Sequence, residues 1–172
     1  MGGGAFGKWS DSPVMKITLI ALSSLKETYL KEAAGEYAKR LGGYCDLKVI
    51  EIKPARLPEK PSAGEIESAL EREAKEIAAK IPPNTYVTAL CIEGKQKTSP
   101  EFAAAISQNY NLGCGMTFLI GSSHGLAESI KQRCNERLSF SKMTFPHQLF
   151  RVMLLEQLYR AFQIINGGEY HK

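Results

Sequence analysis

Residues 15–52 read MKITLIALSSLKETYLKEAAGEYAKRLGGYCDLKVIEI and form one strand–helix–strand unit. The run 15–22 is apolar and contains β-branched residues, which indicates a buried strand. Residues 25–41 have helical spacing and stop at Gly42 and Gly43, and residues 44–52 alternate like a second strand. This unit begins an alternation of strands and helices that continues along the chain.

The alternation extends to residue 165. We expect helices at 64–81, 98–110, 126–134 and 147–165, and strands at 85–92, 116–121 and 136–140. The helix at 98–110 has Ser99 as its expected N-cap and Pro100 at its first position, while 53–63 contains three prolines and predicts a loop. Alternating elements with short links predict one α/β domain, 15–172, with a mainly parallel sheet flanked by helices.

Composition limits the class of protein. Four widely spaced cysteines without a CxxC pair favour reduced core thiols in a cytoplasmic protein. No apolar stretch approaches the ~18 residues of a membrane span, so no membrane partner is expected. A net charge of +4 permits nucleic-acid binding without demanding it. Residues 1–14 are glycine-rich, lack the apolar segment of a secretory signal and predict a disordered leader.

Ligands of such sheets bind at the carboxyl ends of the strands, which here are followed by the segments 91–95, 120–125 and 139–147. Gly121 ends its strand and would let a ligand approach the backbone. The surrounding sequence matches neither the dinucleotide fingerprint nor the P-loop, so a plain turn explains it equally well. Glu93 and Lys95 fit a solvated turn or a carboxylate beside a cofactor. His124 fits a turn better than a metal site, and no metal is predicted.

The final helix is apolar on nearly all sides and must be covered on both faces. The sheet can cover one face and a second subunit the other, which predicts a homodimer. Arg151 falls in the main apolar arc and should meet an anionic ligand or a carboxylate, such as Glu156 of either subunit. His147 starts the helix, where a structural capping role is expected.

The chain ends in NGGEYHK, 166–172, and a terminal tail is ordinarily disordered. Tyr170 and His171 nevertheless combine a stacking ring with a titratable imidazole behind two glycines. This combination favours a tail that closes on a substrate.

Three segments together resemble a known family. FLIGSSHGL (118–126), LSFSKMTFPHQLFRVMLLEQLYRAF (138–162) and the terminal YHK are similar to the RlmH family, the ribosomal large-subunit pseudouridine methyltransferases of the SPOUT class. The resemblance extends over 15–172 and implies an α/β fold with a C-terminal trefoil knot, homodimers and S-adenosylmethionine bound in the knot. It further implies methylation of N3 of a pseudouridine in a 23S rRNA stem-loop of the assembled ribosome.

The resemblance assigns cofactor contacts to Leu90, to Gly121 and to a loop around the adenosine, made of Phe140, Ser141, Lys142, Met143, Thr144 and Phe145. Many relatives carry a second glycine where this chain has Ser122, from which we expect altered loop packing rather than lost binding.

The resemblance also bears on the catalytic step. Tyr170 or His171 is the candidate to position or accept the N3 proton. Arg151 is the candidate to recognise a phosphate or the base, or to build the dimer interface. A related enzyme acting on tRNA and a non-catalytic ribosome-associated protein remain the alternatives.

Overall fold

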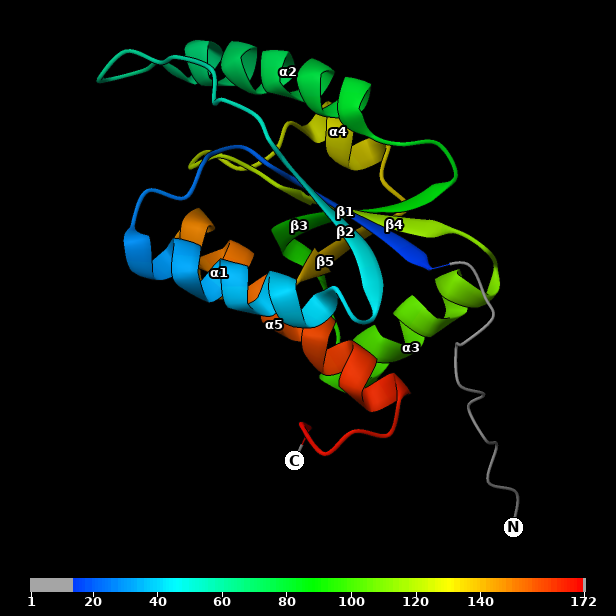
Figure 1. Ribbon diagram of the computed structural model, residues 1–172. Helices are drawn as coiled ribbons and strands as arrows, with labels where there is room; N and C mark the ends of the chain where they lie inside the picture. The colour runs from blue at the N-terminus through cyan, green and yellow to red at the C-terminus, as the bar shows by residue number, and fades with distance from the viewer. Residues whose placement is uncertain (1–13, 172) are drawn as a thin grey trace.

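Five strands form one sheet in the order β2-β1-β4-β3-β5, and every neighbouring pair is parallel. The strands are β1 (Met15–Ala21), β2 (Cys45–Glu51), β3 (Thr85–Gln96), β4 (Gly115–Ile120) and β5 (Glu136–Ser139). This computed structural model describes residues 14–171 (Figure 1). The predicted α/β class with a parallel sheet is therefore confirmed, while the leader prediction falls almost wholly outside the described residues.

Helices cover both faces of the sheet. One face carries α1 (Thr28–Leu41), α3 (Ser99–Asn111) and α5 (His147–Ile165), and the other carries α2 (Ala63–Lys80) and α4 (Glu128–Gln132) (Figure 1). Helix α5 packs against both α1 and α3. The expected range of the last helix is confirmed, whereas α4 is shorter than the predicted 126–134. None of the described helices is both long and apolar enough to cross a membrane.

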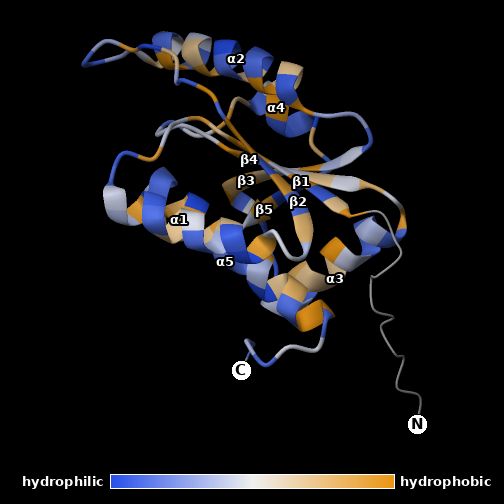
Figure 2. Ribbon diagram, viewed as in Figure 1, coloured by the Kyte–Doolittle hydropathy of each residue, from blue (hydrophilic) through white to orange (hydrophobic). Residues whose placement is uncertain are grey.

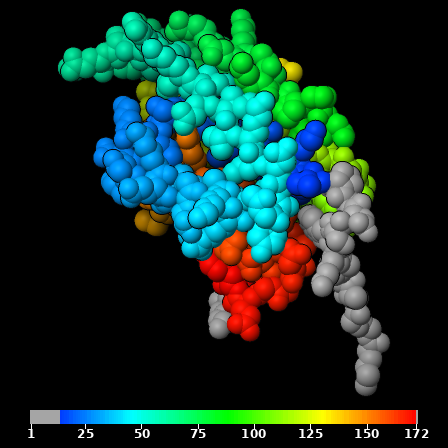
Figure 3. Space-filling view, viewed as in Figure 1, coloured from blue at the N-terminus to red at the C-terminus, as the bar shows by residue number. Residues whose placement is uncertain are grey.

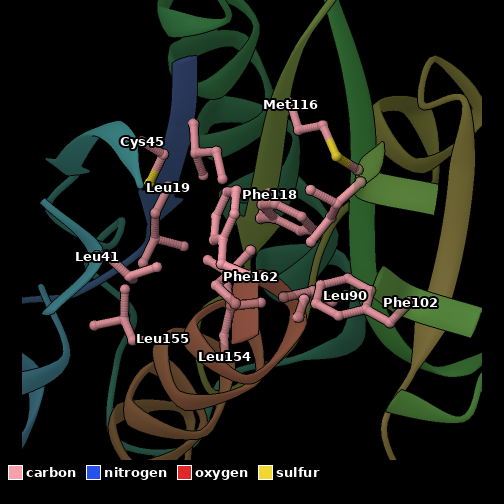
Figure 4. Packing of buried hydrophobic residues seen from close by; sticks show 14 of the residues in the cluster. Leu19, Leu41, Cys45, Leu90, Phe102, Met116, Phe118, Leu154, Leu155 and Phe162 are labelled. Carbon is pink, nitrogen blue, oxygen red and sulfur yellow. The ribbon is translucent and has the colours of Figure 1, made fainter. Parts of the chain in front are cut away.

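The central strands β1 and β4 are apolar along most of their length because helices cover them on both sides (Figure 2). The larger core cluster lies between the sheet and α1, α3 and α5, where Phe118 and Phe162 are fully buried (Figure 4). Burying one such side chain contributes about 1.5–3 kcal/mol. A smaller cluster joins the opposite face to α2 and α4. All four cysteines are free thiols, as expected.

Strand β3 continues beyond its predicted end at residue 92, so Glu93 and Lys95 lie in a strand rather than in a turn. Its pairing with β5 shifts register between Leu90 and Lys95. A Cβ on Gly94 would lie 2.6 Å from the carbonyl carbon of Leu138, so glycine is what permits this close approach of the two strands. The extension brings the end of β3 alongside the end of β5.

Helix α3 begins with a capping box that differs from the predicted cap. The N-cap is Thr98, not Ser99: its hydroxyl accepts from the N–H of Glu101, and the Glu101 carboxylate accepts from the N–H of Thr98. This arrangement satisfies two backbone donors at the helix start, which a serine one residue later would not do in the same way.

Candidate functional site

A cleft of about 800 Å³ opens at the carboxyl ends of β3, β4 and β5. All three segments that the sequence placed at this edge contribute to its walls. Of the eight predicted cofactor residues, seven line the cleft: Leu90, Gly121, Phe140, Ser141, Met143, Thr144 and Phe145. Lys142 is exposed and is not among the lining residues. The structure therefore brings nearly the whole predicted set together.

One wall of the cleft is a tight turn, 121–125, directly after β4. The N–H of Gly125 donates to the carbonyl of Ser122 at 2.9 Å, and Gly125 has a φ of 84°. A Cβ on Gly121 would lie 2.3 Å from the carbonyl oxygen of Gly125. Only glycine fits at position 121, because the neighbouring atoms are backbone and cannot move aside without opening the turn.

The facing wall is the connection from β5 to α5. The Ser139 hydroxyl donates to the carbonyl of Ser141, and the Ser141 hydroxyl accepts from the N–H of Met143 at 3.0 Å. Phe140 packs on Phe150 of α5 with ring centroids 4.8 Å apart. The start of the loop is thus anchored, while the Met143 side chain, 73% exposed, leaves apolar surface open at the cleft.

Charged groups along the β3 side of the cleft are paired. Lys131 of α4 donates to Glu93 and also contacts Glu128, which in turn binds Arg137. The hydrogen bond from Lys131 is the main reason why the pKa of Glu93 lies below its usual range. Glu93 therefore lines the cleft as a paired carboxylate within a strand, and the solvated turn is not formed.

His147 lies at the other end of the cleft, at the start of α5. The N-cap of this helix is Pro146 and no side chain caps it, so the expected capping role of His147 is wrong. Burial lowers the pKa of His147, and the positive charges of Arg151 and Lys26 lower it further.

This shift makes stability depend on pH. Because the folded-state pKa of His147 lies below the ordinary value of about 6.5, the unfolded chain binds the proton more readily. The free energy of unfolding should fall as the pH drops from about 6.5 through the folded-state pKa. The His147→Gln protein should lose this part of the decrease. Urea unfolding at pH 7.5 and 5.5 measures the difference, and equal decreases in both proteins would contradict it.

Arg151 is buried, as its place in the apolar arc required, and it has a carboxylate partner. The partner is Glu51 at the end of β2, at 2.5 Å, and the guanidinium also donates to the carbonyl of Ser23. Glu156, the expected partner, instead binds Arg160 within this chain. Arg151 therefore ties α5 to the ends of β1 and β2 and does not line the cleft.

Removing the partner should cost more than removing the arginine. Glu51→Ala leaves a buried guanidinium without its counter-charge and is expected to lower the free energy of unfolding by about 2 kcal/mol, reduced from the fully buried case because Glu51 is half-exposed. Arg151→Met fills the same space with apolar atoms and should cost about 1 kcal/mol. Urea unfolding of both variants checks the order, and the reverse order would contradict this account.

Residues 166–171 fold back along α5, and none of them lines the cleft of their own chain. The Tyr170 hydroxyl donates to Glu156 at 3.2 Å, and its ring packs edge-on against Tyr159 at 4.9 Å. His171 lies 3.4 Å from Arg160. Burial is the first cause that raises the pKa of Tyr170, to about 12. The predicted catalytic residues of the tail thus stand apart from the predicted cofactor residues within one chain.

A second hollow of about 420 Å³ lies on the α5 side of β5, between α1, α3 and α5. Its walls include Tyr37 and Glu156, and it shares Ser139 and Phe140 with the cleft. Glu156 also accepts a hydrogen bond from Tyr170, so this hollow lies next to the tail as well as next to the cleft. Among residues 14–171, no group of three or more His, Cys, Asp or Glu could hold a metal ion.

Comparison with known proteins gives one consistent result. A family model described as a predicted SPOUT methyltransferase matches residues 15–171. Ribosomal RNA large subunit methyltransferase H of Clostridium acetobutylicum is 50% identical over 159 residues, which cover 92% of this chain and 100% of that protein. The proteins of the same name from Clostridium beijerinckii and Exiguobacterium sibiricum are 49% and 46% identical, with the same coverage.

Proposed function

The chain belongs to the SPOUT methyltransferase family, and we propose that it methylates N3 of a pseudouridine in 23S ribosomal RNA with S-adenosylmethionine as methyl donor. Relatives that match this chain at 46–50% identity carry the name ribosomal RNA large subunit methyltransferase, which supports the class of substrate. The assembled ribosome as substrate, a homodimer, a C-terminal trefoil knot and a cytoplasmic location belong to the same proposal.

The observation that carries the proposal is the cleft between the turn 121–125 and the loop 139–147. Its volume of about 800 Å³ is in the range of small-molecule sites. Phe140 to Phe145 would surround the adenosine, and Leu90 and Gly121 would form the floor on which it lies. S-adenosylmethionine supplies an already activated methyl group, so the chain's task is to align donor and acceptor. A cleft lined by apolar and aromatic side chains on one wall and by a glycine-containing turn on the other suits that task.

The acceptor nitrogen must lose its proton, and the tail is our proposed source of the group that positions or takes it. Tyr170 donates its hydroxyl hydrogen to Glu156 and has a raised pKa, so its phenol stays protonated near neutral pH. His171 is exposed and carries an imidazole, the side chain that most often acts as a general acid or base in proton transfer. A tail held on the outer side of α5 would reach the cleft of a second subunit that packs on this helix, where Leu149 is exposed and Val152 is half-buried.

Arg151 takes a supporting role in this proposal. Its guanidinium is already bound to Glu51 and Ser23, so it is a positioning residue for α5 rather than a group in contact with RNA. A folded Arg151→Met protein should therefore retain methylation activity within a few-fold. If a fully folded Arg151→Met protein lost several hundred-fold of its methylation activity, Arg151 would instead have to contact the substrate.

The charge distribution supports an RNA partner at the same edge of the sheet. The loops 22–27, 52–62, 121–127 and 140–146 hold two carboxylates, Glu27 and Glu59, and five exposed cations: Lys26, Lys53, Arg56, Lys60 and Lys142. Five positive and two negative charges leave +3 of the chain's formal +4 on these loops. Phosphate groups bind where such cations gather, so we propose that RNA covers these four loops.

Reversing three of these charges tests the proposed RNA face. The triple variant Lys53→Glu, Arg56→Glu and Lys60→Glu is expected to methylate ribosomes at least about tenfold more slowly, because phosphate neutralisation is lost. Its affinity for S-adenosylmethionine should be unchanged, since none of the three residues lines the cleft. Lys16→Glu with Lys80→Glu, which reverses two charges at the opposite edge of the sheet, is the control. Equal rates of ribosome methylation for both variants would contradict the proposal that RNA binds these loops.

Two measurements test the function itself. Calorimetry with S-adenosylmethionine should detect binding to the purified protein, and its absence would refute a methyltransferase. Methylation of ribosomes from a strain that lacks the enzyme, followed by mass mapping, should place the new methyl group on one pseudouridine of 23S rRNA. If tRNA were modified instead, S-adenosylmethionine would remain the methyl donor, but the proposed 23S rRNA substrate would be wrong.

A further inference from the structure

Glu73 is a buried carboxylate in the middle of α2 that is tied to the turn of the cleft. Only 6% of the residue is exposed. One carboxylate oxygen accepts from the N–H of Ala55 at 2.9 Å, and the other accepts from the hydroxyl of Ser122 at 3.2 Å. Burying a carboxylate costs free energy unless hydrogen bonds compensate it, so losing either donor should destabilise this arrangement.

The two donors come from different parts of the cleft's surroundings. Ser122 belongs to the turn 121–125 and lines the cleft. Ala55 belongs to the segment 53–62, which projects with the start of α2 at the top of the molecule (Figure 3). Glu73 lies behind the turn, on the face of the sheet that α2 and α4 cover. The Glu73 side chain, which lies outside the cleft, therefore binds both the turn 121–125 and the start of the segment 53–62.

The turn itself closes mainly on its own backbone. Gly125 donates to Ser122, and the contact of Gly121 with Gly125 brings the two ends together. The bond from Ser122 to Glu73 attaches this closed turn to a helix on the other side of the sheet. A glycine at position 122 could not make this bond because it has no hydroxyl.

We propose that Glu73 is a positioning residue for cofactor binding, which acts by holding the hydroxyl of Ser122 and so fixing the shape of the turn 121–125. The inference rests on the proposed function, because it assigns that turn to S-adenosylmethionine. The hydroxyl of Ser122 then attaches the turn to α2.

Variants at both ends of the bond test the proposal. Ser122→Ala and Glu73→Gln are each expected to weaken S-adenosylmethionine binding about tenfold, as measured by calorimetry on the full chain. The double variant should bind no more weakly than Ser122→Ala alone, because once the Ser122 hydroxyl is gone the change at position 73 has no bond to the turn left to weaken. Ala55→Pro removes the other donor without touching the cleft and should weaken binding about threefold.

The chain offers a matched control. Ser129 of α4 donates to Glu71 of the same helix α2 at 2.9 Å, and neither residue lines the cleft. Ser129→Ala and Glu71→Gln should leave the affinity for S-adenosylmethionine within twofold of the parent chain. In methylation assays, Ser122→Ala should raise KM for S-adenosylmethionine about tenfold and leave kcat nearly unchanged, a division that a general loss of stability would not produce.

Each outcome decides between the inference and the function. If the parent chain binds S-adenosylmethionine and Ser122→Ala binds it equally well, the positioning role of Glu73 is overturned while the methyltransferase stands. Additive losses in the double variant would likewise overturn the shared bond. If the parent chain itself binds no S-adenosylmethionine, the proposed function fails first. Should Glu73→Gln not fold, Ser122→Ala alone still decides the question, because it removes a single oxygen from a half-exposed side chain.

Discussion

Gly121→Ala is expected to weaken S-adenosylmethionine binding about 10- to 100-fold. The new Cβ would lie 2.3 Å from the carbonyl oxygen of Gly125, a distance that non-bonded atoms do not tolerate. The Cβ is fixed to the backbone at one end of the turn and the oxygen belongs to the backbone at the other end, so relief requires the turn to open. Opening the turn moves the wall of the cleft, and steric strain of this kind costs about 1–3 kcal/mol.

A second glycine provides the control with the opposite sign. Gly35 lies on the exposed side of α1, and a Cβ there would meet nothing within 4 Å. Gly35→Ala should raise the free energy of unfolding by about 0.5–1 kcal/mol and leave cofactor affinity unchanged. Calorimetry on both variants, with circular dichroism to confirm folding, measures the contrast. A folded Gly121→Ala protein with the parent affinity would remove the turn 121–125 from the cofactor site.

The sequence alone predicted those parts of the fold that depend on local apolar patterns. Strands β1 and β4 lie within a residue of their expected ends, because strands buried on both faces are nearly continuous apolar runs. The three segments of the cleft followed from one rule, that ligands bind at the carboxyl ends of parallel strands. A pattern of this kind needs no knowledge of distant contacts.

What the sequence did not predict depends on contacts between distant residues. Glu93 resembles a turn residue because it is charged, yet the backbone pairing of β3 with β5 keeps it in a strand. Arg151 required a carboxylate, but Glu51 lies 100 residues away and no periodicity identifies it. Glu73 is one of several glutamates on α2, and only the structure shows that it is buried against Ser122. Long-range partners of charged residues are thus the missing information.

Removing residues 170–172 is expected to lower the rate of methylation at least about 100-fold while changing S-adenosylmethionine affinity less than twofold. The described part of this tail contacts Tyr159, Arg160 and Glu156 on α5 and no residue that lines the cleft. Binding of the methyl donor should therefore survive the truncation. The truncated protein would lack the group that positions or accepts the proton of the acceptor nitrogen, so the rate of methylation should fall. Glu169→Gln, an exposed change in the same tail, is the control and should leave the rate unaltered.

Two point variants then separate the residues of the tail. Tyr170→Phe keeps the ring against Tyr159 and loses only the hydroxyl that binds Glu156, so its rate should fall by less than tenfold. His171→Ala should account for most of the loss, because a phenol with a pKa of about 12 stays protonated near neutral pH and cannot serve as the base. A truncated enzyme with full activity would refute the role of the tail. A severe loss of rate in Tyr170→Phe, without a loss in His171→Ala, would assign the role to the Tyr170 hydroxyl instead.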